Sequence, residues 1–263
     1  MPWKGKPYMN RPVTGCIVTY NNMRTIEQAL STVLGCTSCD FRLYVVDNGS
    51  TDGTPEFIEK NYPQVTLIRS SSNIGFGAGH NSVIDLLDSE YHAIINPDVV
   101  LRDDIISDMA SFLDSHEEIG MLSPCIKFPD GRPQILGKRN PTLRYLFASR
   151  MRGSGEPSDI LSEYAMLNED LSKPVRIENA SGCFIFIRTE LFRKLGGFDK
   201  RYFMYFEDCD LSREVNRVSN VYYYPDATVY HEWGRDSKRD LKLKLVHLKS
   251  MFSYFIKWKL GRR

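Results

Sequence analysis

The chain has 263 residues and a mass of 30.3 kDa, and 42% of its residues are hydrophobic. This length can bury one large α/β core or two tightly joined halves. The formal net charge of +1 gives no reason to expect a nucleic-acid partner. Residues 1–15 lack the apolar core of a signal peptide, and no apolar run is long enough to span a bilayer.

The first hundred residues alternate apolar strands with helices. We predict strands at 13–20, 43–46, 65–69 and 93–95, helices at 23–34, near 54–60 and at 81–87, and a glycine-rich loop at 73–79. Near-continuous apolar strands separated by helices indicate a parallel sheet that helices cover on both faces. Ligands of such sheets bind beyond the carboxyl ends of the strands. Four groups of polar residues are predicted there: Thr19 to Asn21, Asp47, Asn73 and Asp98.

The second half is less regular. It contains predicted strands at 121–128, 183–187 and 221–224, a turn at 129–133 and a helix at 142–151. Residues 153–173 are rich in Gly, Pro, Ser and acidic residues, which predicts a long mobile loop. Loops of that length are usually lids or binding loops.

Three carboxylates lie within four residues, at Glu207, Asp208 and Asp210. They directly follow the aromatic run 203–206. On a helix, Glu207 and Asp210 share a face while Asp208 points away from both. An aromatic wall raises the pKa of a carboxylate and prepares it to accept a proton. The alternative is a helix N-terminus that favours acidic residues because of the helix dipole.

Two further carboxylates end strands of the same predicted sheet and can face one cleft. Such a cleft suits a nucleotide diphosphate, with Asp47 accepting hydrogen bonds from the base and Asp98 holding a divalent cation across the phosphates. Asn73, Gly75 and the glycines that follow would let the backbone approach the nucleotide closely. The alternative is that these residues form an ordinary turn and an ordinary strand end. His231 can return to the cleft as a neutral ligand, although a lone histidine is more often structural.

The last 28 residues, 236–263, hold nine Lys or Arg against two Asp, an excess of seven positive charges. Six apolar residues form one helical stripe with lysines 242, 249 and 257 beside it: Leu241, Leu245, Leu248, Phe252, Phe255 and Ile256. A basic amphipathic helix of this kind can lie on an anionic membrane. The alternative is a helix docked on its own domain with a solvated basic edge.

Eight motifs in order give the sequence a family resemblance: Thr19-Tyr20-Asn21, Val46 to Thr54, Asn73 to Asn81, Asn96-Pro97-Asp98, Ser181-Gly182, Gly197-Phe198-Asp199, Glu207 to Asp210 and His231. Over residues 13 to 237 the chain resembles glycosyltransferase family 2. More narrowly, it is similar to the bacterial rhamnosyltransferases that build O-antigen and related cell-surface polysaccharides.

The resemblance implies an α/β GT-A fold, with a Rossmann-like, mostly parallel central sheet flanked by helices, and an inverting transfer from a nucleotide-diphosphate sugar. It implies that Asp208 is the general base with Glu207 beside it, and that His231 faces the metal and diphosphate. It also implies nucleotide contacts at Thr19, Asn21, Asp47 and Asn73, and a metal-side carboxylate at Asp98.

One motif departs from the wider family. Where the family has Asp-X-Asp, this chain has Asn96-Pro97-Asp98 and offers one carboxylate. The rhamnosyltransferase branch is similar in this respect. Binding of Mg²⁺ or Mn²⁺ would then depend on Asp98, His231 and the substrate phosphates.

We therefore predict a GT-A domain over 1–235, followed by a basic amphipathic helix over 236–263. The domain would comprise a nucleotide-sugar-binding half at about 11–100 and an acceptor and catalytic half at 101–235. The expected donor is dTDP-L-rhamnose and the expected acceptor a polyprenyl-diphosphate-linked saccharide, at the cytoplasmic face of the cell membrane. The alternatives are another donor such as a UDP-hexose or UDP-galactofuranose, a sugar-nucleotide nucleotidyltransferase, or a non-catalytic carbohydrate-binding protein.

Overall fold

The structure is a computed structural model that describes residues 12–151, 155–232 and 241–260. The first hundred residues supply, in order, β1 (Val13–Thr19), α1 (Ile26–Cys36), β2 (Phe41–Asp47), α2 (Thr54–Asn61), β3 (Thr66–Arg69), α3 (Phe76–Asn81), a 3-10 turn (Ile84–Leu86), β4 (Tyr91–Ile95) and β5 (Val99–Val100). The rest supplies α4 (Ile105–Asp114), β6 (Ile119–Lys127), α5 (Leu143–Met151), α6 (Asp159–Tyr164), β7 (Val175–Ile177), β8 (Phe184–Arg188), α7 (Thr189–Leu195), α8 (Glu207–Val215), β9 (Asn220–His231) and α9 (Leu241–Leu260).

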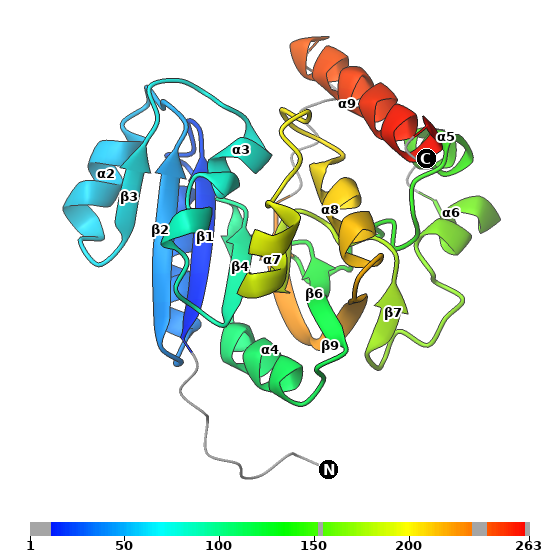
Figure 1. The fold of residues 1–263 in the computed structure, drawn as a ribbon, viewed down its shortest axis with the longest axis horizontal. Helices are drawn as coiled ribbons and strands as arrows, with labels where there is room; N and C mark the ends of the chain where they lie inside the picture. Colours follow the sequence, from blue (N-terminus) through cyan, green and yellow to red (C-terminus); the bar gives the residue numbers. More distant parts are fainter. Residues whose placement is uncertain (1–11, 152–154, 233–240, 261–263) are drawn as a thin grey trace.

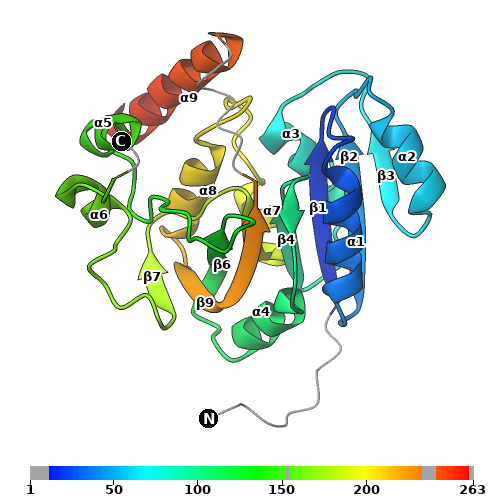
Figure 2. The same ribbon diagram turned by 180° about the vertical axis from the view of Figure 1, so that it is seen from behind.

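The described strands form one nine-stranded sheet flanked by helices (Figures 1 and 2). Its order is β3-β2-β1-β4-β8-β6-β9-β5, and β7 pairs with β9 beside this path. The strands β1 to β4 are parallel. β8 then runs antiparallel between β4 and β6, and the short strands β5 and β7 run antiparallel to β9. The parallel part predicted from the sequence is confirmed, and the antiparallel pairings all involve strands from the second half of the sheet.

Helices bury both faces of the first strands. All seven residues of β1 are buried. Ile17 belongs to a core cluster that α1 and α4 complete, whereas its neighbour Val18 belongs to the cluster on the other face with residues of α7 and α8. Each fully buried aliphatic side chain contributes about 1.5–3 kcal/mol. The near-continuous apolar runs therefore have the two-sided burial that they predict.

The glycine-rich segment differs from the prediction. Residues 73–79 were expected to be a loop before a helix at 81–87, but α3 already begins at Phe76 and ends at Asn81. The reason is close packing. A Cβ on Gly77 would lie 2.7 Å from Phe198, and one on Gly79 would lie 2.8 Å from Val18. Only glycine at these positions lets this short helix pack so tightly on β1 and on the segment before α8.

The predicted long loop at 153–173 is also corrected. Its described residues include the helix α6, which packs on α5. The rings of Tyr145 and Tyr164 stack with their centroids 4.8 Å apart, and Leu161 completes this small cluster. Residues 153 and 154 lie outside the described residues. The apolar contacts of α6 went unrecognised because Gly, Pro and Ser surround it in the sequence.

The helix α9 docks on the domain beside α5 and above α8 (Figures 1 and 2). Tyr254 is buried in a cluster with Tyr202 and Phe206, and the hydroxyl of Ser250 donates to the carbonyl of Met204 at 2.8 Å. Five of the six predicted stripe residues point outward instead, with exposed fractions of 41–73%: Leu241, Leu245, Leu248, Phe252 and Ile256. The helix is thus docked, and its apolar stripe lies on the outer side. The rest of the predicted helical segment, 236–240 and 261–263, lies outside the described residues.

Candidate active site

The polar motifs meet at one edge of the sheet. The register pairs Thr19 with Asp47 and Asp47 with Arg69, so β1, β2 and β3 end together. β8 begins at that edge with Phe184 opposite Ile95, because it runs antiparallel to β4. β6 and β9 run parallel to each other and antiparallel to β8, so they too end there. The sequence-based expectation of a shared edge is confirmed.

Asp47 is buried, and its two carboxylate oxygens differ in their hydrogen bonding. Its Oδ2 accepts hydrogen bonds from the backbone N–H groups of Gly49 at 3.1 Å and Ser50 at 3.0 Å. Its Oδ1 has no hydrogen-bond partner among the described residues. A buried carboxylate oxygen without a donor is costly. Asp47 is therefore ready to accept a hydrogen bond from a ligand.

Thr19, Asn21 and Asn73 shape the loops around Asp47. The buried hydroxyl of Thr19 donates to the side chain of Asn22 at 3.1 Å. Asn21 adopts a φ of 56°, and its Oδ1 accepts from the N–H of Thr51 at 2.8 Å, which ties the β1 and β2 loops together. Asn73 Oδ1 accepts from the N–H of Gly75 at 3.0 Å. Contact of these residues with a nucleotide stays a prediction.

Gly75 brings its backbone against another part of the protein. Its φ is 92°, and a Cβ there would lie 2.3 Å from the carbonyl oxygen of Phe203. The same carbonyl accepts from the N–H of Phe76 at 2.9 Å. At Gly75, Gly77 and Gly79 a Cβ would collide with the chain itself. Close approach of this backbone to a nucleotide stays a prediction.

Asp98 and His231 face each other across the end of the sheet. Asp98 Oδ1 lies 3.3 Å from His231 Nε2, and the side chains are 22% and 11% exposed. Asn96 Nδ2 lies 3.4 Å from the same nitrogen. Within the described residues, no three His, Cys, Asp or Glu side chains form a metal-binding group. The protein thus offers one carboxylate and one imidazole here.

The acidic motif begins α8, and its first carboxylate is buried. Burial and the neighbouring charge of Asp208 raise the pKa of Glu207 to about 8. Asp208 is half-buried and accepts from the N–H of Gly182 at 2.9 Å and that of Cys209 at 2.8 Å. Burial raises the pKa of Asp208, whereas these N–H groups lower it. Glu207 and Asp210 are both buried, while Asp208 turns toward Gly182, as the helical spacing predicts.

The backbone before this motif is strained. Tyr205 and Phe206 adopt φ values of 71° and 68°, a left-handed conformation that costs non-glycine residues of order 1–3 kcal/mol each. Such strain persists only where surrounding contacts enforce it. Buried Phe206 packs with Tyr202 and Tyr254, so of the predicted aromatic run 203–206 Phe206 joins a buried aromatic cluster, whereas Phe203 is 39% exposed.

Cys183 connects the two acidic parts of the site. Burial raises the pKa of its thiol to about 12, and the charges of Asp98 and Asp208 contribute to the rise. Its carbonyl accepts from the N–H of Asn96 at 2.9 Å. The metal-side carboxylate and the acidic motif therefore face a common region around the start of β8.

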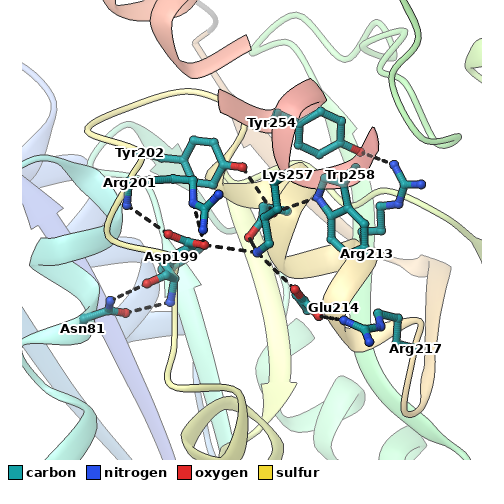
Figure 3. Close-up of polar contacts among 12 residues, drawn as sticks. Asn81, Asp199, Arg201, Tyr202, Arg213, Glu214, Arg217, Tyr254, Lys257 and Trp258 are labelled. Atoms are coloured by element: carbon teal, nitrogen blue, oxygen red, sulfur yellow. Dashed lines mark hydrogen bonds and ion pairs between the residues drawn. The ribbon is translucent and has the colours of Figure 1, made fainter. Parts of the chain in front are cut away.

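Asp210 is held from α9, which the sequence did not predict. Lys257 Nζ contacts Asp210 at 2.7 Å, Glu214 at 3.0 Å and Asp199 at 3.1 Å. Figure 3 shows Lys257 between Asp199 and Glu214. The indole N–H of Trp258 donates to Asp210 at 2.8 Å. We had placed Lys257 beside the outer stripe; it instead turns inward. Three acids and one lysine far apart in the sequence gave no local signal of this network.

Comparisons with known proteins agree with this geometry. Residues 15–196 match the family model for glycosyl transferase family 2. The chain is 29% identical over 251 residues to the N-acetylglucosaminyl-diphospho-decaprenol L-rhamnosyltransferase of Mycobacterium tuberculosis, covering 90% of this chain and 81% of that one. It is 24% identical to the rhamnosyltransferase WbbL of Escherichia coli, over 68% of this chain and 70% of that one.

A solved structure shares the fold. The mannosyltransferase PcManGT of Pyrobaculum calidifontis, in complex with GDP-Man and Mn²⁺, matches this structure with a TM-score of 0.67 at 21% sequence identity. The match covers 98% of this chain and 68% of the PcManGT chain. The sheet and the carboxylates at its edge define a GT-A glycosyltransferase. The chain belongs to glycosyl transferase family 2, since the family model covers most of it. The predicted fold, family and enzyme class are confirmed.

Proposed function

We propose that the enzyme transfers L-rhamnose from dTDP-L-rhamnose, with inversion, to a hydroxyl of a lipid-diphosphate-linked saccharide in bacterial surface polysaccharide synthesis. The main support is the name of the M. tuberculosis relative, which gives both the transferred sugar and a diphospho-decaprenol acceptor for that protein. The E. coli relative is also a rhamnosyltransferase. Another donor remains the alternative, because one structural neighbour was solved with UDP-GlcNAc.

Asp208 is the proposed general base. It would accept the proton of the acceptor hydroxyl as that oxygen attacks C1 of the sugar from the face opposite the leaving diphosphate. Its carboxylate is half-buried and fixed by the N–H groups of Gly182 and Cys209, which hold it in one orientation. Positioned base catalysis contributes on the order of a hundred- to ten-thousandfold.

Glu207 would support Asp208 by remaining neutral. With a pKa of about 8, Glu207 keeps its proton at pH 7. Burial raises the pKa of Asp208 as well, and its two N–H donors oppose that rise by favouring the charged form. A protonated Glu207 does not repel the negative charge of Asp208. The two adjacent carboxyls thus divide into one acid form and one base form.

Asp98 and His231 fit a divalent cation, Mg²⁺ or Mn²⁺, as two of its ligands. A carboxylate oxygen and an imidazole nitrogen at 3.3 Å are a donor set that such ions accept, and the donor phosphates would complete it. When bound, the cation would stabilise charge on the leaving diphosphate. Asp47, with its unpartnered oxygen, would accept from the base, and Thr19, Asn21 and Asn73 would form the surrounding nucleotide site.

The helices α5 and α9 would place the enzyme on the cytoplasmic face of an anionic cell membrane. Leu143, Phe147 and Met151 of α5 are 59–69% exposed and follow one another at helical spacing. They add to the exposed stripe of α9, and Leu146 of α5 packs in the same cluster as Tyr254 of α9. Lys249 and Lys259 of α9 are exposed. No helix in the described part of the chain is long and apolar enough to cross a bilayer.

The testing experiment is a transfer assay read by mass spectrometry. Purified enzyme with Mg²⁺ or Mn²⁺ would receive a synthetic N-acetylglucosamine-diphosphate-lipid and, in separate reactions, dTDP-rhamnose or a UDP- or GDP-sugar. We expect the mass of one deoxyhexose to be added with dTDP-rhamnose alone. Product with a different donor would keep the mechanism and replace the sugar. Neither product nor donor hydrolysis with any donor would reject the proposed activity.

The same assay tests Asp208. We expect Asp208→Asn to retain donor binding, measured by calorimetry, and to lose at least about a hundredfold in transfer rate. Asp226→Asn is the matched control, because Asp226 is an exposed aspartate on β9 outside the site. Near-normal turnover of Asp208→Asn would remove Asp208 from the role of base.

A further inference from the structure

A pocket of about 210 Å³ opens beside the proposed base and is not used by the donor residues described above. Its wall comes from the end of β6, from residues 133–138, and from Asn179, Ser181 and Tyr223. β6 ends at the same edge of the sheet as β9, and residues 181–183 lead into β8 at that edge. The pocket therefore lies on the catalytic edge of the sheet, on the side of the second half of the chain.

Hydrogen bonds place the pocket between the two acidic parts of the site. Gln134, in its wall, donates from Nε2 to the carbonyl of His231 at 2.7 Å. Ser181, also in its wall, directly precedes Gly182, whose N–H binds Asp208. Tyr164 packs against Gly137 of the wall. Burial raises the pKa of the Tyr164 hydroxyl, and the neighbouring Cys209 and Asp208 add to the rise.

Of the described residues that line this pocket, Lys138 alone is charged. It forms no ion pair with an acidic side chain within the described residues, and its ammonium lies 4.8 Å from the centre of the Tyr223 ring. Burial lowers the pKa of Lys138. Its backbone is fixed, since its N–H donates to the carbonyl of Tyr164 and its own carbonyl accepts from Glu178 and Asn179. A lysine on a fixed backbone, with no acidic partner among the described residues, is suited to bind an anionic ligand.

The rest of the pocket combines one further polar group with apolar walls. Asn179 is 6% exposed; its Nδ2 donates to the carbonyl of Gly137 at 2.9 Å, while its Oδ1 has no partner in the described parts of the chain. That oxygen can accept from a hydroxyl or amide of a bound sugar. The remaining lining includes aliphatic side chains: Ile135, Leu136, Leu167 and Leu171.

We propose that this pocket binds the acceptor, with Lys138 paired to the diphosphate that joins the acceptor sugar to its lipid. This inference rests on the proposed function. In such an acceptor the reacting hydroxyl and the diphosphate are substituents of one sugar ring. With the hydroxyl at Asp208, the diphosphate would lie about one ring away, and the pocket wall that contains Ser181 and Gly137 also contains Lys138 to receive it. The aliphatic side chains suit the first carbons of the lipid.

The experiment compares two acceptors in Lys138→Met, with Lys138→Arg as the conservative variant. One acceptor is N-acetylglucosamine-diphosphate-lipid, and the other is a neutral alkyl glycoside of N-acetylglucosamine. For Lys138→Met we expect KM for the diphosphate acceptor to rise about ten- to a hundredfold, since hydrogen bonds to charged groups have that effect. We expect unchanged turnover of the neutral glycoside and partial rescue in Lys138→Arg.

Three results would overturn the inference. An equal loss on both acceptors would mean that Lys138 only supports the fold. Weaker binding of dTDP in Lys138→Met would assign the lysine to the donor diphosphate. An unchanged KM for the diphosphate acceptor would leave Lys138 without a ligand role. Donor hydrolysis and transfer by the unmodified enzyme report the proposed function separately, so failure of that function is distinguishable.

Discussion

Replacing Lys257 with Met should destabilise the protein strongly at neutral pH. The side chain of Asp210 is 2% exposed and that of Lys257 is 19% exposed, so their contact at 2.7 Å is largely shielded from water. Met has a similar length and keeps most of the packing of the lysine stem. The substitution therefore removes the charge and leaves Asp210 as a buried carboxylate without its cation.

The expected loss follows from these contacts. Breaking a buried pair by removing one partner costs about 3–5 kcal/mol, because an uncompensated charge remains. Trp258 Nε1 and the hydroxyl of Tyr202 still donate to Asp210, and Asp199 and Glu214 are 23% and 24% exposed. We therefore expect the low end, about 3 kcal/mol. For a chain of this size, that corresponds to a fall in Tm of about 6–12 °C.

The effect should depend on pH in a defined direction. Burial raises the pKa of Asp210, and Lys257 lowers it, so removing Lys257 raises this pKa further. A carboxyl with a raised pKa in the folded state favours folding at low pH, where it is protonated, and destabilises as pH rises through that pKa. The difference in the free energy of unfolding between wild type and Lys257→Met should then be largest at pH 7.5 and smaller at pH 4.5.

Urea unfolding at both pH values measures this, with Lys249→Met as the control. Lys249 lies on the same helix and is exposed, so its replacement should change stability by less than about 0.5 kcal/mol. Equal midpoints for the two variants at pH 7.5, or a loss for Lys257→Met that does not shrink at low pH, would refute the reasoning.

Two further predictions concern the acidic motif and the outer stripe. The pKa of Glu207 is raised to about 8 from an ordinary value near 4.5, so its burial costs stability increasingly as pH rises through this range. Glu207→Gln should therefore gain stability relative to wild type between pH 5 and pH 8 in urea titrations; a constant difference would contradict the buried, protonated state. On the stripe, Leu245→Asp, Phe252→Asp and Phe147→Asp should each weaken binding to anionic vesicles at least about tenfold in co-sedimentation, since each removes an apolar side chain from the lipid. Val218→Asp is the matched control, because Val218 is 58% exposed outside these helices. Equal vesicle binding by all four variants would mean that the stripe does not contribute to membrane binding.

The sequence predicted the features that repeat locally. Runs such as 13–19 and 91–95 are mostly apolar and are buried at every residue because both sheet faces are covered, and the apolar excess is visible in composition alone. The polar residues after each strand, among them Asp47 and Asp98, then fall on one edge by topology. Family resemblance added the proposed roles of Glu207 and Asp208, which composition leaves open between a base and a helix N-terminus.

What the sequence did not predict depends on contacts between distant segments. In the sequence, Gly75 looks like a glycine that lets a ligand approach the backbone. The fold shows that it also packs closely against Phe203, which lies 128 positions later in the chain. Lys257 looks like part of a basic helix edge until Asp199 and Asp210 are brought to it. Lys138 lies in an unremarkable polar segment, and only the fold shows it lining a pocket with no acidic partner among residues 12–151, 155–232 and 241–260. No local period or spacing encodes such pairings.

The outward stripe of α9 and the exposed face of α5 also affect how this protein behaves in a test tube. In buffer without lipid or detergent, these eight large side chains have only each other, or those of another copy, to escape water. Two copies facing through them would bury the same patch twice with a two-fold axis between them. An oligomer seen by gel filtration in plain buffer should therefore dissociate when detergent micelles are added, which would identify these side chains as the contact between copies.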